Sequence, residues 1–117
     1  LILVGLCGSE LLKAGTAAGL RCAGEAFADR AYRADGSLVP RGIPGAVIKD
    51  PASCAARAIS MATDGFVTAL SGERVMLRPD TICLHGDGDG ALELAEALST
   101  ALREAGVELR PLSHTDA

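Results

Sequence analysis

The sequence predicts an α/β fold with mostly parallel strands and one β-hairpin. Short apolar runs typical of strands alternate with segments of helical periodicity, which is the pattern of parallel strands joined by crossover helices. Ala and Leu supply most of the 49% hydrophobic content and aromatic residues only 3%, which favours a helix-rich chain over an all-β sandwich. A chain of 117 residues is long enough for one small domain with its own core.

The first elements follow from their capping residues. Residues 1–6 are predicted to form a strand buried on both faces. Ser9 can cap a helix over 9–18, and Gly19 would end it. Residues 20–25 form a second short strand. The apolar face of the helix is expected to comprise Leu11, Ala14, Gly15 and Ala18.

The central segment begins with a long stretch that has no sustained periodicity. Residues 26–49 are too many for an idle connection in a compact domain, so we expect a functional loop. Asp50 followed by Pro51 is typical of a helix start, and Gly65 would end that helix. Its inner face is expected to comprise Ala55, Ala58, Ile59 and Ala62.

The last third of the chain predicts a hairpin, two strands and the longest helix. Residues 67–70 and 74–77 read as a hairpin with a three-residue loop. Residues 81–86 and 107–111 read as strands, and 88–105 as a helix between them. The apolar stripe of this helix comprises Ala91, Leu94, Leu98, Ala101, Leu102 and Ala105.

Charge and hydropathy exclude several function classes. A formal net charge of −4 leaves no basic surface for phosphates, so we expect neither nucleic acid nor an anionic membrane as a partner. No apolar run approaches the roughly 20 residues that a membrane span needs.

The cysteines indicate a reducing compartment. Cys7, Cys22, Cys54 and Cys83 are far apart and show no zinc-ligand spacing. Three of them lie in apolar segments, where Cys behaves as a small core residue. We therefore expect buried, reduced thiols and a cytoplasmic location.

Polar residues gather where two predicted parallel strands end, which is where such folds bind ligands. The first group comprises Glu25, Asp29, Arg30, Tyr32, Arg33 and Arg41. The second comprises His85, Asp87 and Asp89. Because a carboxylate can fix the tautomer of an imidazole, His85 and Asp87 are a candidate acid–base pair.

Each group also has a purely structural interpretation. Asp87 or Asp89 can simply cap the helix that follows, and His85 can serve as a structural hydrogen-bonding residue. The charges at 25–33 can be exposed ion pairs of little energetic value.

The glycines at 86, 88 and 90 suggest a phosphate loop only weakly. Their spacing is not that of the dinucleotide fingerprint, no Lys follows, and Asp87 and Asp89 would repel phosphate. A calcium loop fails as well, because Ala91 stands where the third ligand belongs.

Three stretches together resemble the LamB/YcsF family, the A subunit of the bacterial 5-oxoprolinase system. They are EAFADRAY at 25–32, DGSLVPR with PGAVI across 35–48, and DTICLHGD at 80–87. They occur in the family's order, and the resemblance covers nearly the whole chain. It implies a single partial domain over 1–117, the C-terminal half of an irregular β/α barrel of the glycoside hydrolase/deacetylase type. We expect 113–117 to be a loose tail.

The family's activity, carried over by resemblance, is the ATP-dependent hydrolysis of 5-oxoproline to glutamate together with B and C subunits. Two N-terminal signatures of the family, which contribute to its active-site cleft, are absent from these residues. We therefore expect this piece alone to be inactive and the remaining N-terminal half to be one of its partners.

The resemblance also implies roles for the polar residues at the strand ends. His85 and Asp87 would position or deprotonate water. Glu25, as a further catalytic residue, would act beside them on the ring nitrogen or on a divalent metal.

Three further residues of the same loop would bind substrate. Asp29 would contact the ring nitrogen or a divalent metal. Arg30 or Arg41 would hold the substrate carboxylate or a phosphorylated intermediate, since guanidinium groups pair with such oxygens.

Two other functions stay open. One is a non-catalytic interaction module that docks a partner, and the open sheet edges favour pairing, including with a second copy. The other is a metal-dependent deacetylase-like hydrolase, which only the fold relation suggests.

Overall fold

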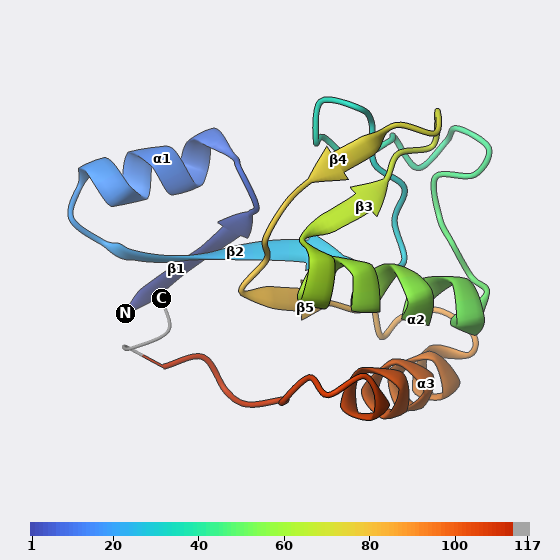
Figure 1. The fold of residues 1–117 in the computed structure, drawn as a ribbon. Helices are drawn as coiled ribbons and strands as arrows, with labels where there is room; N and C mark the ends of the chain where they lie inside the picture. The colour runs from blue at the N-terminus through green and yellow to red at the C-terminus, as the bar shows by residue number, and fades with distance from the viewer. Residues whose placement is uncertain (114–117) are drawn as a thin grey trace.

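The computed structural model describes residues 1–113 and confirms a mixed α/β fold with a mostly parallel sheet (Figure 1). Its elements are β1 (Ile2–Leu6), α1 (Glu10–Ala17), β2 (Arg21–Phe27), α2 (Pro51–Ile59), the π-helical turn η1 (Ser60–Asp64), β3 (Phe66–Thr68), β4 (Arg74–Met76), β5 (Thr81–Cys83) and α3 (Ala91–Glu104). Apart from Ser113, the tail expected at 113–117 lies outside the described residues. None of the helices in the described part is long and apolar enough to cross a membrane.

The sheet is three-stranded and parallel, in the order β1-β2-β5, while β3 and β4 form a separate antiparallel hairpin. In register, Leu6 lies opposite Glu25 and Glu25 opposite Thr81, so all three strands end at the same edge. Asp80 fixes this register, because its Oδ2 accepts a hydrogen bond from the Gly24 amide at 2.8 Å. The side chain of Asp80, together with the backbone ladder, therefore sets the position of β5 relative to β2.

α1 covers only one side of β1, so the expectation of a strand buried on both faces is wrong. β1 is an edge strand, and Val4 is 40% exposed. The helix approaches closely at Gly15, where an added Cβ would lie 2.4 Å from Cδ2 of Leu3. Half-buried Leu12 and buried Gly15 therefore make the contact face, and Leu11, expected there, is largely exposed.

The predicted N-caps of the first two helices are confirmed. Ser9 Oγ accepts from the Leu12 amide at 3.4 Å, and Asp50 Oδ2 accepts from the Ser53 amide at 3.0 Å. Gly65, with φ +72°, ends the second helix after the π turn. A left-handed backbone conformation favours glycine, which is why a glycine in the sequence predicts the end of this helix correctly.

α2 and α3 lie side by side against the sheet and enclose the main core (Figure 1). On α2 the buried residues include Cys54 and Ala58, and Met61 follows in η1. The longer Met61 side chain takes the place expected for Ala62, which is exposed. On α3, the buried residues of the predicted stripe are Leu94, Leu98 and Leu102.

The last third of the chain differs from the predictions in four respects. β5 ends at Cys83, and α3 begins only at Ala91 after an exposed glycine-rich turn. Its N-cap is Gly90 at φ +79°, so neither Asp87 nor Asp89 caps the helix.

Residues 107–111 form no strand. The Val107 amide instead bonds to the Leu102 carbonyl at 2.9 Å and closes α3. Pro111 has no N–H with which to continue a ladder.

Candidate functional site

His85 and Asp29 meet where β5 and β2 end. Phe27 lies opposite Cys83 in the parallel register, and Asp29 and His85 each follow two residues later. Nδ1 of His85 lies 2.9 Å from Oδ2 of Asp29. The ring of His85 also stacks on Phe27, with centroids 5.5 Å apart and planes inclined by 10°. Carboxylate and aromatic ring together hold the imidazole in one orientation.

The two residues of this pair differ in how far they are exposed to solvent. Asp29 is buried, while the side chain of His85 keeps 31% of its surface exposed. Oδ1 of Asp29 has no hydrogen-bond partner within residues 1–113. The carboxylate is therefore an inner, fixed group, and the histidine is the one that can meet a substrate.

Arg41 reaches the outer nitrogen of His85, with Nη2 lying 3.4 Å from Nε2. A guanidinium only donates hydrogen bonds, so Nε2 must accept and Nδ1–H must donate to Asp29. The partners thus assign the Nδ1–H tautomer. In this state Nε2 carries the lone pair that a general base needs.

Two side chains, half-buried Arg57 and buried Tyr32, fix the backbone that carries Asp29. Arg57 of α2 donates from Nε to the Ala28 carbonyl at 3.1 Å and from its terminal nitrogen to the Arg30 carbonyl. Burial lowers the pKa of Arg57. Tyr32 accepts from the Phe27 amide at 3.1 Å, and burial raises the pKa of its hydroxyl.

Arg30 points into the protein rather than toward the histidine. It is 9% exposed, its Nη2 donates to the Val39 carbonyl at 2.9 Å, and its Nε has no partner among the described residues. Val39 also receives support from Ala31, whose carbonyl accepts from the Val39 amide at 3.0 Å. Arg30 therefore holds the loop that carries Arg41.

Glu25 and Asp87 lie away from the His85–Asp29 contact. Glu25 is half-buried on β2, and together with Asp29 it adds to the effect of burial in raising the pKa of the Cys83 thiol. Asp87 is exposed and makes no hydrogen bond or ion pair in the described part of the chain. The histidine's carboxylate partner is thus Asp29, because strand register brings it closer than the neighbour in sequence.

The thiols are unpaired, as expected, but they are less buried than expected. Only Cys54 is fully buried, and Cys7, Cys22 and Cys83 are half-buried. Burial is the main cause that raises the pKa of Cys54, whose Sγ donates to the Ile48 carbonyl at 3.4 Å.

Residues 1–113 hold no ready-made metal cluster, and the charge of one turn disfavours phosphate. No group of three His, Cys, Asp or Glu residues between positions 1 and 113 is arranged to hold a metal ion. The turn at 86–90 carries Asp87 and Asp89, whose charges oppose phosphate.

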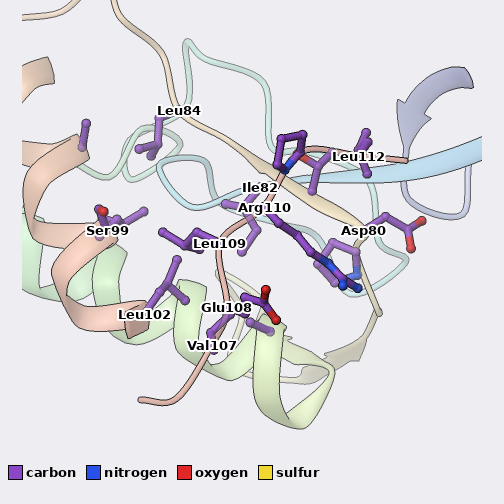
Figure 2. Close-up of a pocket in the computed structure, with 16 residues that line it drawn as sticks. Asp80, Ile82, Leu84, Ser99, Leu102, Val107, Glu108, Leu109, Arg110 and Leu112 are labelled. Carbon is purple, nitrogen blue, oxygen red and sulfur yellow. The ribbon is translucent and has the colours of Figure 1, made fainter. Parts of the chain in front are cut away.

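A groove of about 640 Å³ lies apart from His85, between β5, α3 and the C-terminal segment (Figure 2). Ile82, Leu84, Leu102 and Leu109 supply much of its apolar wall, and neither His85 nor Asp29 lines it. β5 is an edge strand of the described sheet, and its residues Thr81 and Ile82 line the groove.

Comparison with known proteins gives consistent results. The LamB/YcsF family model matches residues 1–117. The 5-oxoprolinase A subunit of Rhodopseudomonas palustris (strain BisB18) is 50% identical over 113 residues, which cover 97% of this chain and 44% of that protein. The 5-oxoprolinase A subunit of Pyrococcus abyssi (strain GE5 / Orsay) is 53% identical over 112 residues, or 96% and 44% of the two chains.

A solved structure agrees with these relatives. The crystal structure of the lactam utilization protein from Thermus thermophilus matches with a TM-score of 0.90 and 45% identity, over 96% of this chain and 44% of that one. The chain thus spans less than half the length of the relatives it matches.

Proposed function

Because this chain belongs to the LamB/YcsF family, we propose that the complete protein carrying it acts as the A subunit of 5-oxoprolinase and hydrolyses 5-oxoproline to glutamate. The names of its relatives support the reaction class. The observation that carries the proposal is the hydrogen bond between His85 and Asp29 at the common end of β2 and β5. It supplies an oriented base whose outer nitrogen, Nε2, faces the exposed side chain of Arg41.

The proposed chemistry adds one water across the ring amide. His85 Nε2 takes a proton from water while the oxygen forms a bond to the ring carbonyl carbon. The C–N bond of the lactam then breaks, and the same proton passes to the leaving nitrogen, which yields the amine and carboxylate of glutamate. Asp29 stabilises the imidazolium formed between the two transfers.

Two neighbouring residues have proposed contacts with the substrate. Arg41 is exposed beside Nε2 and would pair with the ring carboxylate, because a guanidinium binds carboxylate with two parallel hydrogen bonds. Glu25, near the same edge of the sheet, would approach the ring nitrogen. Arg30 is not proposed as a substrate ligand, because it is buried and bonded to Val39.

ATP and the B and C subunits belong to the proposed complete reaction. Transfer of the terminal phosphoryl group of ATP to the carbonyl oxygen, with release of ADP, would weaken amide resonance and make attack by water easier. Opening of the ring would then leave an acyl phosphate, which a second water hydrolyses to the carboxylate and inorganic phosphate. Because the turn at 86–90 does not fit a triphosphate, no nucleotide step is assigned to these residues. The metal-dependent alternative would need ligands from outside residues 1–113, since no three His, Cys, Asp or Glu residues within them are arranged to hold a metal ion.

A role in assembly is a second candidate, and one observation favours it. Apolar side chains in and next to β1 and α1 are exposed: Leu1, Val4, Leu11 and Leu20. A neighbouring part of the complete protein or another chain of the assembly would cover such a surface. This role is compatible with catalysis at His85.

The test is glutamate release by the complete protein assembled with B and C subunits. We expect glutamate and ADP to form together from 5-oxoproline and ATP, and neither the complete protein alone nor the B and C pair alone to release glutamate. The 117-residue chain alone is expected to be inactive. His85→Gln should lower kcat for glutamate release by about 10²- to 10⁴-fold, and Arg103→Gln, on the exposed face of α3, should leave it unchanged. Full activity of His85→Gln would refute the proposed site.

A further inference from the structure

We propose that Arg41 blocks the base nitrogen of His85 and that the carboxylate of the substrate removes this block. The inference rests on the proposed function and specifies its substrate class: small lactams that carry a carboxylate. Arg41 would then be a specificity-determining residue as well as a ligand of the substrate.

Both nitrogens of His85 are already engaged. Asp29 Oδ2 takes the Nδ1 hydrogen at 2.9 Å, and Nη2 of Arg41 lies 3.4 Å from Nε2, which bears the lone pair. A proton added at Nε2 would face a donor that is itself positively charged. While Arg41 stays in place, its N–H group therefore occupies the lone pair of Nε2 that would otherwise face a water.

The block is built to be released. Its N···N distance of 3.4 Å is long for a hydrogen bond. Within residues 1–113 this is the one hydrogen bond of the Arg41 side chain, and the side chain is exposed. Arg41 can therefore turn away from His85 without losing another partner.

The loop around Arg41 is fixed at its base and exposed at its tip, residues 40–45. Val39 and Ala46 are buried, and both bond through their backbones to Ala31, at 3.0 and 2.9 Å. Next to Arg41, a Cβ added at Gly42 would meet no atom within 4 Å. The side chain has room to move while the loop keeps its position beside the histidine.

A carboxylate competes strongly for this arginine. Two charge-assisted hydrogen bonds in a fork are stronger than one long bond to a neutral imidazole. A lactam with a carboxylate would draw Arg41 away and free Nε2 in the same event. A lactam without one would enter a site whose base is still engaged.

The kinetic test uses the complete protein assembled with B and C subunits and two substrates, 5-oxoproline and its neutral carboxamide. For Arg41→Ala, we expect kcat/KM for 5-oxoproline to fall by about 10-fold or more and kcat for the carboxamide to rise. Arg41→Lys should recover part of the 5-oxoproline activity. Arg33→Ala, an exposed arginine of the same loop, should behave as wild type.

The outcome that would overturn the inference is equally specific. A role in binding alone predicts that Arg41→Ala leaves the carboxamide unchanged. A role in folding predicts that both substrates lose activity to the same extent. Either result refutes a block at Nε2.

A spectroscopic arm separates this inference from the proposed function. In protein labelled with ¹⁵N-histidine, the Nε2 resonance of His85 is assigned by its loss in His85→Gln. We expect 5-oxoproline to change the chemical shift of this resonance in the wild type. In Arg41→Ala, the resonance should already have the chemical shift of the unblocked nitrogen before 5-oxoproline is added. Saturating 5-oxoproline with no shift in the wild type would refute the block. Failure of the complete system to release glutamate would refute the proposed function instead.

Discussion

Oδ2 of Asp29 lies 2.9 Å from Nδ1 of His85, although the two residues are 56 positions apart in the chain. Phe27 of β2 and Cys83 of β5 lie opposite each other in the sheet, and Asp29 and His85 each follow their strand partner by two residues. The parallel sheet therefore assembles the pair, and the ring of Phe27 holds it from the side. The buried carboxylate lies behind the partly exposed imidazole, which is the arrangement needed for the imidazole to exchange a proton with a bound substrate.

Asp29→Asn is expected to lower kcat for 5-oxoproline by about 10²- to 10⁴-fold, with little change in KM. The amide loses the charge that stabilises the imidazolium and can present an N–H to Nδ1, which favours the other tautomer. Steady-state kinetics of the complete assembly measure the effect, with circular dichroism as the control for folding. A loss smaller than twofold would mean that Asp29 does not act through His85.

Asp87→Asn should lower kcat far less than Asp29→Asn does. Asp87 is exposed and has no hydrogen bond to His85 in the structure, whereas Asp29 is buried against it. Both variants remove one carboxylate, so each is the matched control of the other. Equal losses would show that the neighbour in sequence, not the neighbour in register, is the working partner.

Much of the fold can be predicted because its signals are local. Ser9 and Asp50 satisfy amides within their own helices, and Gly65 supplies a left-handed backbone that other residues avoid. The three buried leucines of α3 follow from helical periodicity. These features depend on a few neighbouring residues, which can be read directly from the sequence.

The rest depends on contacts between distant segments. Sequence alone identifies His85 and Asp29 as candidates but pairs His85 with Asp87, because register between β2 and β5 has no local signal. Residues 107–111 alternate like a strand, but they join no β-ladder with the strands that the structure describes. Which face of β1 is buried likewise depends on the position of α1, and the apolar run at residues 1–6 does not reveal it.

Arg57→Met is expected to destabilise the fold by about 1–3 kcal/mol. The change leaves the Ala28 and Arg30 carbonyls beside Asp29 without their donor. The control is Arg103→Met, which removes an exposed arginine from α3 and should cost less than about 0.5 kcal/mol. Urea unfolding of the complete protein measures both. Equal midpoints for the two variants would contradict the structural role of Arg57.

The first turn of α2 should open as the pH falls below about 4. Hydrogen bonds from the hydroxyl and then the amide of Ser53 lower the pKa of Asp50. A lowered folded pKa means that stabilisation is complete above the unfolded pKa and is lost as pH falls through the folded one. Hydrogen exchange at the Ser53 amide, corrected for intrinsic rates, measures this opening. Asp50→Asn accepts the same bonds without titrating, so its protection should stay constant; identical profiles would contradict the account.

The most direct test of the His85–Asp29 centre is a double-mutant cycle on kcat for 5-oxoproline hydrolysis by the complete assembly. It compares wild type, Asp29→Asn, His85→Gln and the double variant. If Asp29 acts only through His85, the double variant will be no slower than His85→Gln alone. If the two losses multiply, the residues act independently and the proposed centre is wrong.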